Sequence, residues 1–231
     1  MKKMPALWVR REHFKINKLE IGNHLNTAFP MAFQMSIIAI GALILQVALN
    51  GLGAVSVAAY TASQKIDAIA TMPMNSFGQA MATYSAQNYG AGKVERIKKG
   101  VWQCIFMSVG FSILMGFVNV FAGSNLAAVF VGNGELEVLK LAKIYLSING
   151  VLYPVLALLF IYRFTLQGLG NGLVPTIAGI MELLMRAFGA LILVGPLGFA
   201  GACMANPLAW IGACVPLAVA YYMTVRKLSV V

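Results

Sequence analysis

The chain has 231 residues, of which 60% are hydrophobic and only 10% are charged, and its formal net charge is +10. Soluble domains carry roughly 25% charged residues, so this composition excludes an ordinary soluble domain and indicates a membrane protein. The long apolar runs show no strand periodicity, which excludes a membrane β-barrel and predicts an all-α, polytopic bundle.

Six apolar stretches are long enough to cross a hydrocarbon core of about 30 Å, which takes about 20 helical residues. They lie near residues 25–50, 54–85, 101–123, 138–167, 173–195 and 198–224. Glycine-rich turns, such as those at 90–92 and 195–198, join them and make successive helices antiparallel. We therefore expect a six-helix transmembrane lobe over residues 23–228, between a basic cytoplasmic linker over 1–22 and a short cytoplasmic tail over 229–231.

The basic residues are distributed unevenly between the two ends of the predicted helices. Twelve of the 17 Lys and Arg residues precede the first span or follow the second or the sixth, whereas the connections at 51–53, 124–137 and 195–197 hold none. This positive-inside pattern predicts that both termini lie in the cytoplasm, with the chain in the inner (plasma) membrane of the cell. It also assigns the positive charge to contact with membrane lipid rather than with nucleic acid.

Catalytic and metal-binding patterns are absent from the sequence. There is no HExxH and no GxSxG, and both histidines, His13 and His24, precede the first span or lie at its edge. Cys104, Cys203 and Cys214 fall inside apolar spans without metal-ligand spacing. We therefore expect no enzyme, no metal site and no cofactor.

A polar stripe runs along one face of the second span. Its members recur at helical spacing and are Tyr60, Gln64, Asp67, Thr71 and Asn75. Lipid contact does not permit such a stripe, so it faces either a functional cavity or a hydrogen-bonded seam between helices. Asp67 has no basic partner on its own helical face. It lines the cavity, pairs across the bundle with Arg163 or Arg186, or lies solvated near the external interface.

Polar residues on two other spans are candidates for the same space. They are Gln34 on the first span and Asn149, Tyr153, Arg163 and Gln167 on the fourth. An alternative for Arg163 is that its side chain snorkels to the nearby cytoplasmic face. On the fifth span, Glu182 and Arg186 lie one helical turn apart, which favours a structural ion pair over a role in proton or substrate coupling.

Several of these stretches together resemble a known family. The segment QNYGAGK at residues 87–93, the segment LQGLGN at 166–171 and the Glu182–Arg186 spacing are similar to the multidrug and toxic compound extrusion (MATE) family. The resemblance covers nearly the whole chain. Because such transporters have twelve spans in two six-helix lobes, it implies that this chain is the C-terminal lobe alone: a fragment, the product of a split gene, or a half that forms homodimers.

The resemblance implies secondary antiport, in which entry of Na⁺ or H⁺ drives the export of organic cations and drugs through a cavity between the lobes. The implied partners are small organic cations, membrane lipid and a second six-helix lobe, which is either a missing N-terminal half or a second copy. Two alternatives stay open. The chain could be a lobe of a flippase like the related exporters of lipid-linked oligosaccharides, or an accessory membrane protein without transport.

Overall fold

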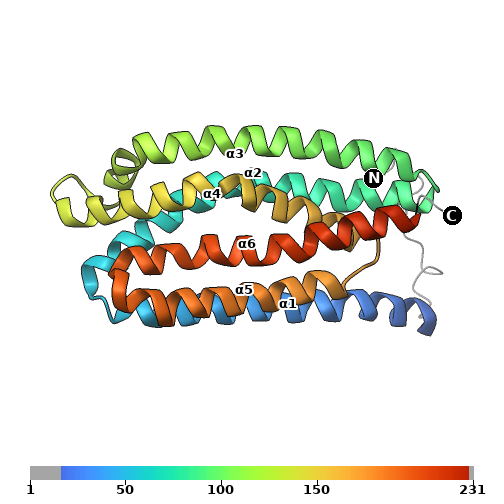
Figure 1. Cartoon of the computed structure of the whole chain (residues 1–231), viewed down its shortest axis with the longest axis horizontal. Helices are drawn as coiled ribbons and strands as arrows, with labels where there is room; N and C mark the ends of the chain where they lie inside the picture. Colours follow the sequence, from blue (N-terminus) through green and yellow to red (C-terminus); the bar gives the residue numbers. More distant parts are fainter. Residues whose placement is uncertain (1–16, 229–231) are drawn as a thin grey trace, which may run out of the picture.

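The structure, a computed structural model, describes residues 17–228 as a bundle of long antiparallel helices (Figure 1). These are α1 (Lys18–Asn50), α2 (Ala54–Gly90), α3 (Val94–Val131), α4 (Leu136–Gly168), α5 (Leu173–Phe188), the π-helix η3 (Gly189–Leu193) and α6 (Val194–Leu228). Because α1 begins at Lys18, the end of the predicted linker forms its first turn. The rest of that linker, residues 1–16, and the predicted tail lie outside the described residues.

The helices extend further than the apolar stretches alone predict. The basic run at residues 96–99 lies in the first turns of α3 rather than in a loop, and residues 91–93 form the connection before it. At the other end, the predicted loop 124–137 is wrong, because only residues 132–135 separate α3 from α4. The 37 residues of α2 reach about 55 Å, longer than the hydrocarbon core, so its ends extend to headgroup depth.

The reversal between the last two membrane helices falls at the glycine-rich turn that the sequence predicts. Gly198 has φ 55° and ψ −132°, a conformation that interrupts the helix and that residues with a Cβ rarely adopt. The helical segments on either side of it are Leu173–Leu197 and Phe199–Leu228. The short π-helix before this turn has no counterpart in the sequence prediction.

Within residues 17–228, five helices are long and apolar enough to cross a membrane. They are His24–Asn50, Val94–Val131, Leu136–Gly168, Leu173–Leu197 and Phe199–Leu228. The predicted six-helix bundle is confirmed, but α2 is not one of these five. Its length suffices for a crossing, and its polar residues lower its hydropathy below that of the other helices.

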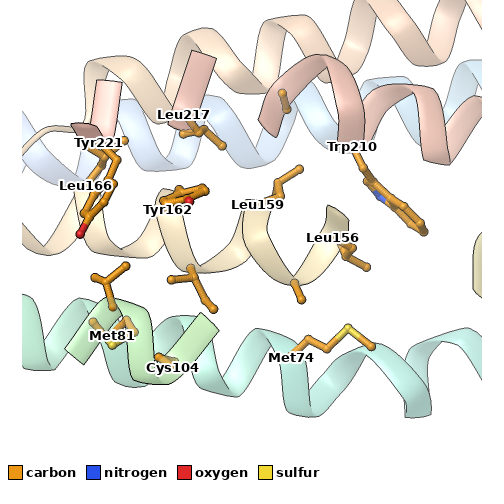
Figure 2. Close-up of a cluster of buried hydrophobic side chains, with 14 of the residues drawn as sticks. Met74, Met81, Cys104, Leu156, Leu159, Tyr162, Leu166, Trp210, Leu217 and Tyr221 are labelled. Carbon is orange, nitrogen blue, oxygen red and sulfur yellow. The ribbon is translucent and has the colours of Figure 1, made fainter. Parts of the chain in front are cut away.

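The helices form two groups that share a central core. In Figure 1, α2, α3 and α4 lie in one half of the bundle and α1, α5 and α6 in the other, and α4 packs against α6 where the halves meet. Figure 2 shows Leu159 and Tyr162 of α4 between Met81 on α2 and Leu217 on α6. By contrast, α1 with α2 and α4 with α5 make few contacts, which leaves room between the two groups for a cavity.

Helices α3 and α4 come into close backbone contact at two glycines. A Cβ added to Gly116 would collide with the carbonyl oxygen of Gly150. A Cβ added to Gly150 would lie 3.1 Å from the carbonyl oxygen of Gly116. Small residues allow this backbone contact between membrane helices, where dispersion contacts replace the hydrophobic effect as the driving force.

We expect Gly116→Ala to destabilise the bundle by about 1–3 kcal/mol, because the backbones of α3 and α4 must separate. Gly110→Ala on the same helix is the matched control, since a Cβ there meets nothing within 4 Å. Alanine is the better helix former, so the control should keep or gain stability. Thermal unfolding in detergent, followed by circular dichroism, measures both. Equal losses in the two variants would contradict the close approach.

Candidate functional site

A cavity of about 480 Å³ lies between the two helix groups, within the range of small-molecule sites. Helices α1, α2, α4, α5 and α6 all contribute to its wall. The polar and charged lining residues are Gln34, Asp67, Thr71, Asn75, Arg163, Gln167, Glu182, Arg186 and Asn206. Ionisable groups inside a membrane bundle are costly, so four of them around one cavity mark it as the candidate functional site.

The structure brings together most of the residues that the sequence singles out. Those that line the cavity are Gln34, Asp67, Thr71, Asn75 and Arg163, together with the predicted pair Glu182 and Arg186. The polar stripe on α2 therefore divides along its length. Its middle, from Asp67 to Asn75, faces the cavity, whereas its beginning, at Tyr60 and Gln64, does not.

The Asp67 carboxylate is held by a hydrogen-bonded chain that crosses three helices. The Tyr153 hydroxyl on α4 donates to Asp67 Oδ1 at 2.6 Å, and Asn119 Nδ2 on α3 donates to the same hydroxyl oxygen at 2.7 Å. Tyr153 thus lies behind the cavity wall and fixes the orientation of the carboxylate. Both Tyr153 and Asn119 are fully buried, so these hydrogen bonds are shielded from solvent.

The alternatives for Asp67 are resolved by its neighbours. Within residues 17–228 it forms no ion pair, so the predicted pairing with Arg163 or Arg186 is not found. Its place in the wall of a cavity shared by five helices also differs from a solvated position at the external interface. Asp67 is therefore the one carboxylate of the lining that has no guanidinium partner among the described residues.

The other charged lining residues form a buried cluster. Arg163 Nη2 donates to Glu182 Oε1, and Arg186 Nη2 lies 3.9 Å from Glu182 Oε2. Arg163, Glu182 and Arg186 are only 7%, 4% and 6% exposed. The predicted Glu182–Arg186 pair is present, but the closer partner of Glu182 is Arg163 on α4.

Arg163 does not snorkel to the cytoplasmic face, because a buried carboxylate on α5 offers it a stronger partner at membrane depth. One carboxylate and two guanidiniums give the cluster a formal charge of +1. Asp67 carries the opposite charge, so the four ionisable groups of the lining sum to zero. The formal charge of the lining is therefore zero overall, with the negative Asp67 on α2 and the positive cluster on α4 and α5.

Arg186 also connects α5 with its two neighbours. Its Nη1 atom donates to the carbonyl oxygen of Ile38 on α1 at 3.2 Å, and its Nε atom donates to Asn206 Oδ1 on α6 at 3.0 Å. Gly41 makes the approach to α1 possible, since a Cβ there would lie 3.1 Å from Arg186 Nη1. This guanidinium is thus tied to the framework, and a ligand has less access to it than to Asp67.

The other predicted site residues have structural contacts instead. Gln64 Nε2 donates to the Tyr60 hydroxyl at 2.7 Å, and the Tyr60 ring packs edge-on against Tyr145 with centroids 5.3 Å apart. Asn149 is fully buried and donates to the carbonyl oxygen of Tyr145 at 3.0 Å. Tyr60 thus belongs to the contact between α2 and α4, and Asn149 to the contact between α4 and α6, where it lies 3.5 Å from the carbonyl oxygen of Cys203. Gln64 is exposed.

Two atoms at the cavity wall keep unused hydrogen-bonding capacity. Arg163 Nε and Gln167 Oε1 are buried and have no partner among residues 17–228. Gln167 uses its amide nitrogen to donate to Gln34 Oε1 at 3.1 Å, which bridges α4 and α1. One buried donor and one buried acceptor beside the cavity are therefore without a hydrogen-bond partner among the described residues.

Three residues of the site are missing from the sequence prediction. Asn206 and Trp210 line the cavity from α6, and Asn119 supports Tyr153 from α3. For the two asparagines a signal exists, because an amide inside an apolar span needs a partner. For Trp210 there is none. Within the described part of the chain, no group of three His, Cys, Asp or Glu side chains is placed to hold a metal ion.

A bundle of long apolar helices around a cavity lined by charged groups is the architecture of a multi-pass membrane protein. The MatE family model matches residues 30–192 of the sequence. The chain therefore belongs to the MatE family, whose members are membrane transporters rather than enzymes. No curated protein matches the chain in sequence.

Solved structures share the fold at low sequence identity. An outward-facing multidrug resistance MATE family transporter of the MOP superfamily is 17% identical with a TM-score of 0.90, and the match covers 98% of this chain and 51% of the transporter. The Vibrio cholerae MATE transporter VcmN in its bent form is 16% identical with a TM-score of 0.84, covering 96% of this chain and 51% of VcmN.

A MOP superfamily transporter from Pyrococcus furiosus is 18% identical with a TM-score of 0.79, covering 85% of this chain and 43% of that protein. The chain thus spans about half the length of the transporters it matches. The expectation of a MATE-type lobe is confirmed in fold and family.

Proposed function

We propose that the chain is the C-terminal lobe of a two-lobe secondary antiporter, which exports organic cations and drugs in exchange for Na⁺ or H⁺. The observation that carries this proposal is Asp67 in the cavity wall of a MatE-family lobe, with no guanidinium beside it. A carboxylate in a low-dielectric cavity attracts a cationic ligand strongly. The family assignment makes transport the function that such binding serves.

The remaining lining suits the apolar part of an organic cation. Trp210, Phe160 and Phe164 contribute aromatic rings, and Met31 and Met35 contribute flexible thioether side chains. Aromatic faces attract cations, and methionines adapt to ligands of different shape. Such a lining supports a broad range of amphipathic compounds rather than one substrate.

The outer face of α2 supports a second lobe as partner. Several polar side chains of this helix are exposed: Thr61, Gln64, Lys65, Ser76 and Gln79. Thr61, Gln64, Ser76 and Gln79 each donate one hydrogen bond within α2. Their remaining polar atoms and the charged Lys65 still favour a polar protein surface or a wet cleft over hydrocarbon. In paired-lobe transporters the two repeats build the central site together and rock against each other, so we propose that export needs a second six-helix lobe or a second copy.

The flippase alternative calls for a cavity rich in basic groups. Here Arg163 and Arg186 are the basic groups of the lining, and both contact Glu182. This arrangement favours a cation rather than a pyrophosphate-linked lipid as substrate. An accessory protein without transport remains the alternative that a transport measurement tests.

We expect both termini in the cytoplasm, because the basic residues gather at one end of the bundle. Topology reporters fused after Lys99 and after Lys227 should score as cytoplasmic, and one inserted near Gly134 should score as external. An external score at either basic position would contradict this orientation.

The experiment for the proposed function is export from proteoliposomes. Two samples are reconstituted: the chain alone, and the chain joined to a second six-helix lobe. An inward Na⁺ or H⁺ gradient is imposed on each, and efflux of a fluorescent organic cation is followed. Gradient-dependent export by the joined protein is the expected result. Export at the same rate with and without either gradient would contradict antiport. Export by the chain alone would indicate that two copies can replace the two-lobe arrangement.

A further inference from the structure

A second hollow, of about 370 Å³, lies between α3 and α6 and shares no lining residue with the central cavity. Its lining residues are Lys98, Val101, Trp102 and Ile105 on α3, and Tyr221, Tyr222, Val225 and Arg226 on α6. Figure 1 shows the beginning of α3 and the end of α6 at the same end of the bundle. This is the end at which the basic residues gather.

The charged side chains of this hollow are both basic. Lys98 Nζ lies 2.6 Å from Glu95 Oε1, but Glu95 is 82% exposed and outside the hollow, so this surface pair contributes little and exchanges readily. Among the side chains that the structure describes, which do not include residue 20, no carboxylate pairs with Arg226. The hollow therefore offers two cations to an anionic group between the helices.

The apolar part of the hollow is continuous with the lipid-facing surface of α3. Trp102 is 65% exposed. About one turn further along α3, Phe106 and Met107 are also exposed, and they line a neighbouring hollow together with Trp102. On the other side, the Tyr222 ring packs edge to face against Tyr221, with ring centroids 5.3 Å apart. Tryptophan and tyrosine favour the headgroup depth of a bilayer, so the hollow lies where headgroup and acyl chain meet.

We propose that this hollow binds one anionic phospholipid of the leaflet at the basic end of the bundle. Lys98 and Arg226 hold the phosphate, and the first part of an acyl chain lies along Trp102 and Ile105. Basic pockets between membrane helices select anionic headgroups in this way. The hollow opens sideways to hydrocarbon, which favours a lipid over a soluble phosphate compound. This site is independent of the export proposed for the central cavity.

Trp102 provides the measurement, because lipids brominated on the acyl chain quench a tryptophan that they touch. The full chain is reconstituted in phosphatidylcholine vesicles that contain a small share of either brominated phosphatidylglycerol or brominated phosphatidylcholine. The chain has three tryptophans, so the signal of a Trp102→Phe variant is subtracted. We expect brominated phosphatidylglycerol to quench Trp102 at a mole fraction at least about fivefold lower than brominated phosphatidylcholine needs.

The Lys98→Gln/Arg226→Gln variant should lose this preference. Lys93→Gln/Lys227→Gln is the matched control, because it removes the same charge from the same end at positions outside the hollow, and it should keep the preference. Equal quenching of wild-type Trp102 by the two lipids would overturn the site, whatever the variants do. Equal loss in both double variants would also overturn it, since the preference would then arise from diffuse charge.

Discussion

Asp67→Asn is expected to reduce export of a cationic dye by about tenfold in the two-lobe protein, with a smaller effect on a neutral dye. The substitution keeps the size of the side chain and removes the only lining carboxylate without a guanidinium partner among residues 17–228. The attraction between unit charges about 4 Å apart ranges from about 1 kcal/mol in bulk water to about 4 kcal/mol at the effective dielectric of a protein. Even the lower part of this range gives about a tenfold change.

Two further variants separate the charge of Asp67 from its orientation. Asp67→Glu keeps the charge and should retain most of the preference for the cation. Tyr153→Phe keeps the charge but removes the 2.6 Å hydrogen bond, so it should reduce the export of the cation less than Asp67→Asn does. Efflux is compared at equal amounts of folded protein. Unchanged export of both dyes by Asp67→Asn would remove this residue from the mechanism.

The second large effect concerns stability. Glu182→Gln should destabilise the bundle by about 3–5 kcal/mol, because it leaves two buried guanidiniums without their carboxylate. Combining it with Arg163→Gln should restore much of the loss, since Arg163 is the closer partner and the two amides can bond to each other. Combining it with Arg186→Gln should restore less, because Arg163 then stays unpaired.

Melting temperature and yield after purification in detergent measure this series. Arg186 also bonds to Ile38 and Asn206, so its replacement adds a loss of its own. Equal loss in the single variant and in the Glu182→Gln/Arg163→Gln variant would contradict a structural pair. That result would favour a role of Glu182 in coupling instead.

Helical periodicity predicts which residues share a face, and this explains what the sequence could and could not provide. Asp67, Thr71 and Asn75 lie together in the cavity wall because they share one face of α2. Tyr60 lies on the same face, but there α4 covers it with Tyr145. Packing across the bundle decides which neighbouring helix covers a face. The spacing of residues within one helix does not predict that neighbour.

The ion-pair cluster illustrates the same limit. The spacing of Glu182 and Arg186 reveals a pair within one helix. The closer contact, between Glu182 and Arg163, joins α5 to α4, and no local rule connects residues 19 positions apart. The glycine turn at Gly198, by contrast, depends only on local backbone conformation and is therefore predictable.

The central claim is that the cavity inside this lobe binds the organic cation during export, and filling that cavity tests it most directly. Thr71→Trp places a large ring in the cavity, whereas Ile113→Trp adds the same ring on the exposed, lipid-facing side of α3. Gradient-driven efflux of an organic cation is measured for both variants in proteoliposomes at matched protein levels. We expect Thr71→Trp to abolish export and Ile113→Trp to leave it at the wild-type rate. Wild-type export by Thr71→Trp would contradict the claim and place the path of the cation outside this cavity.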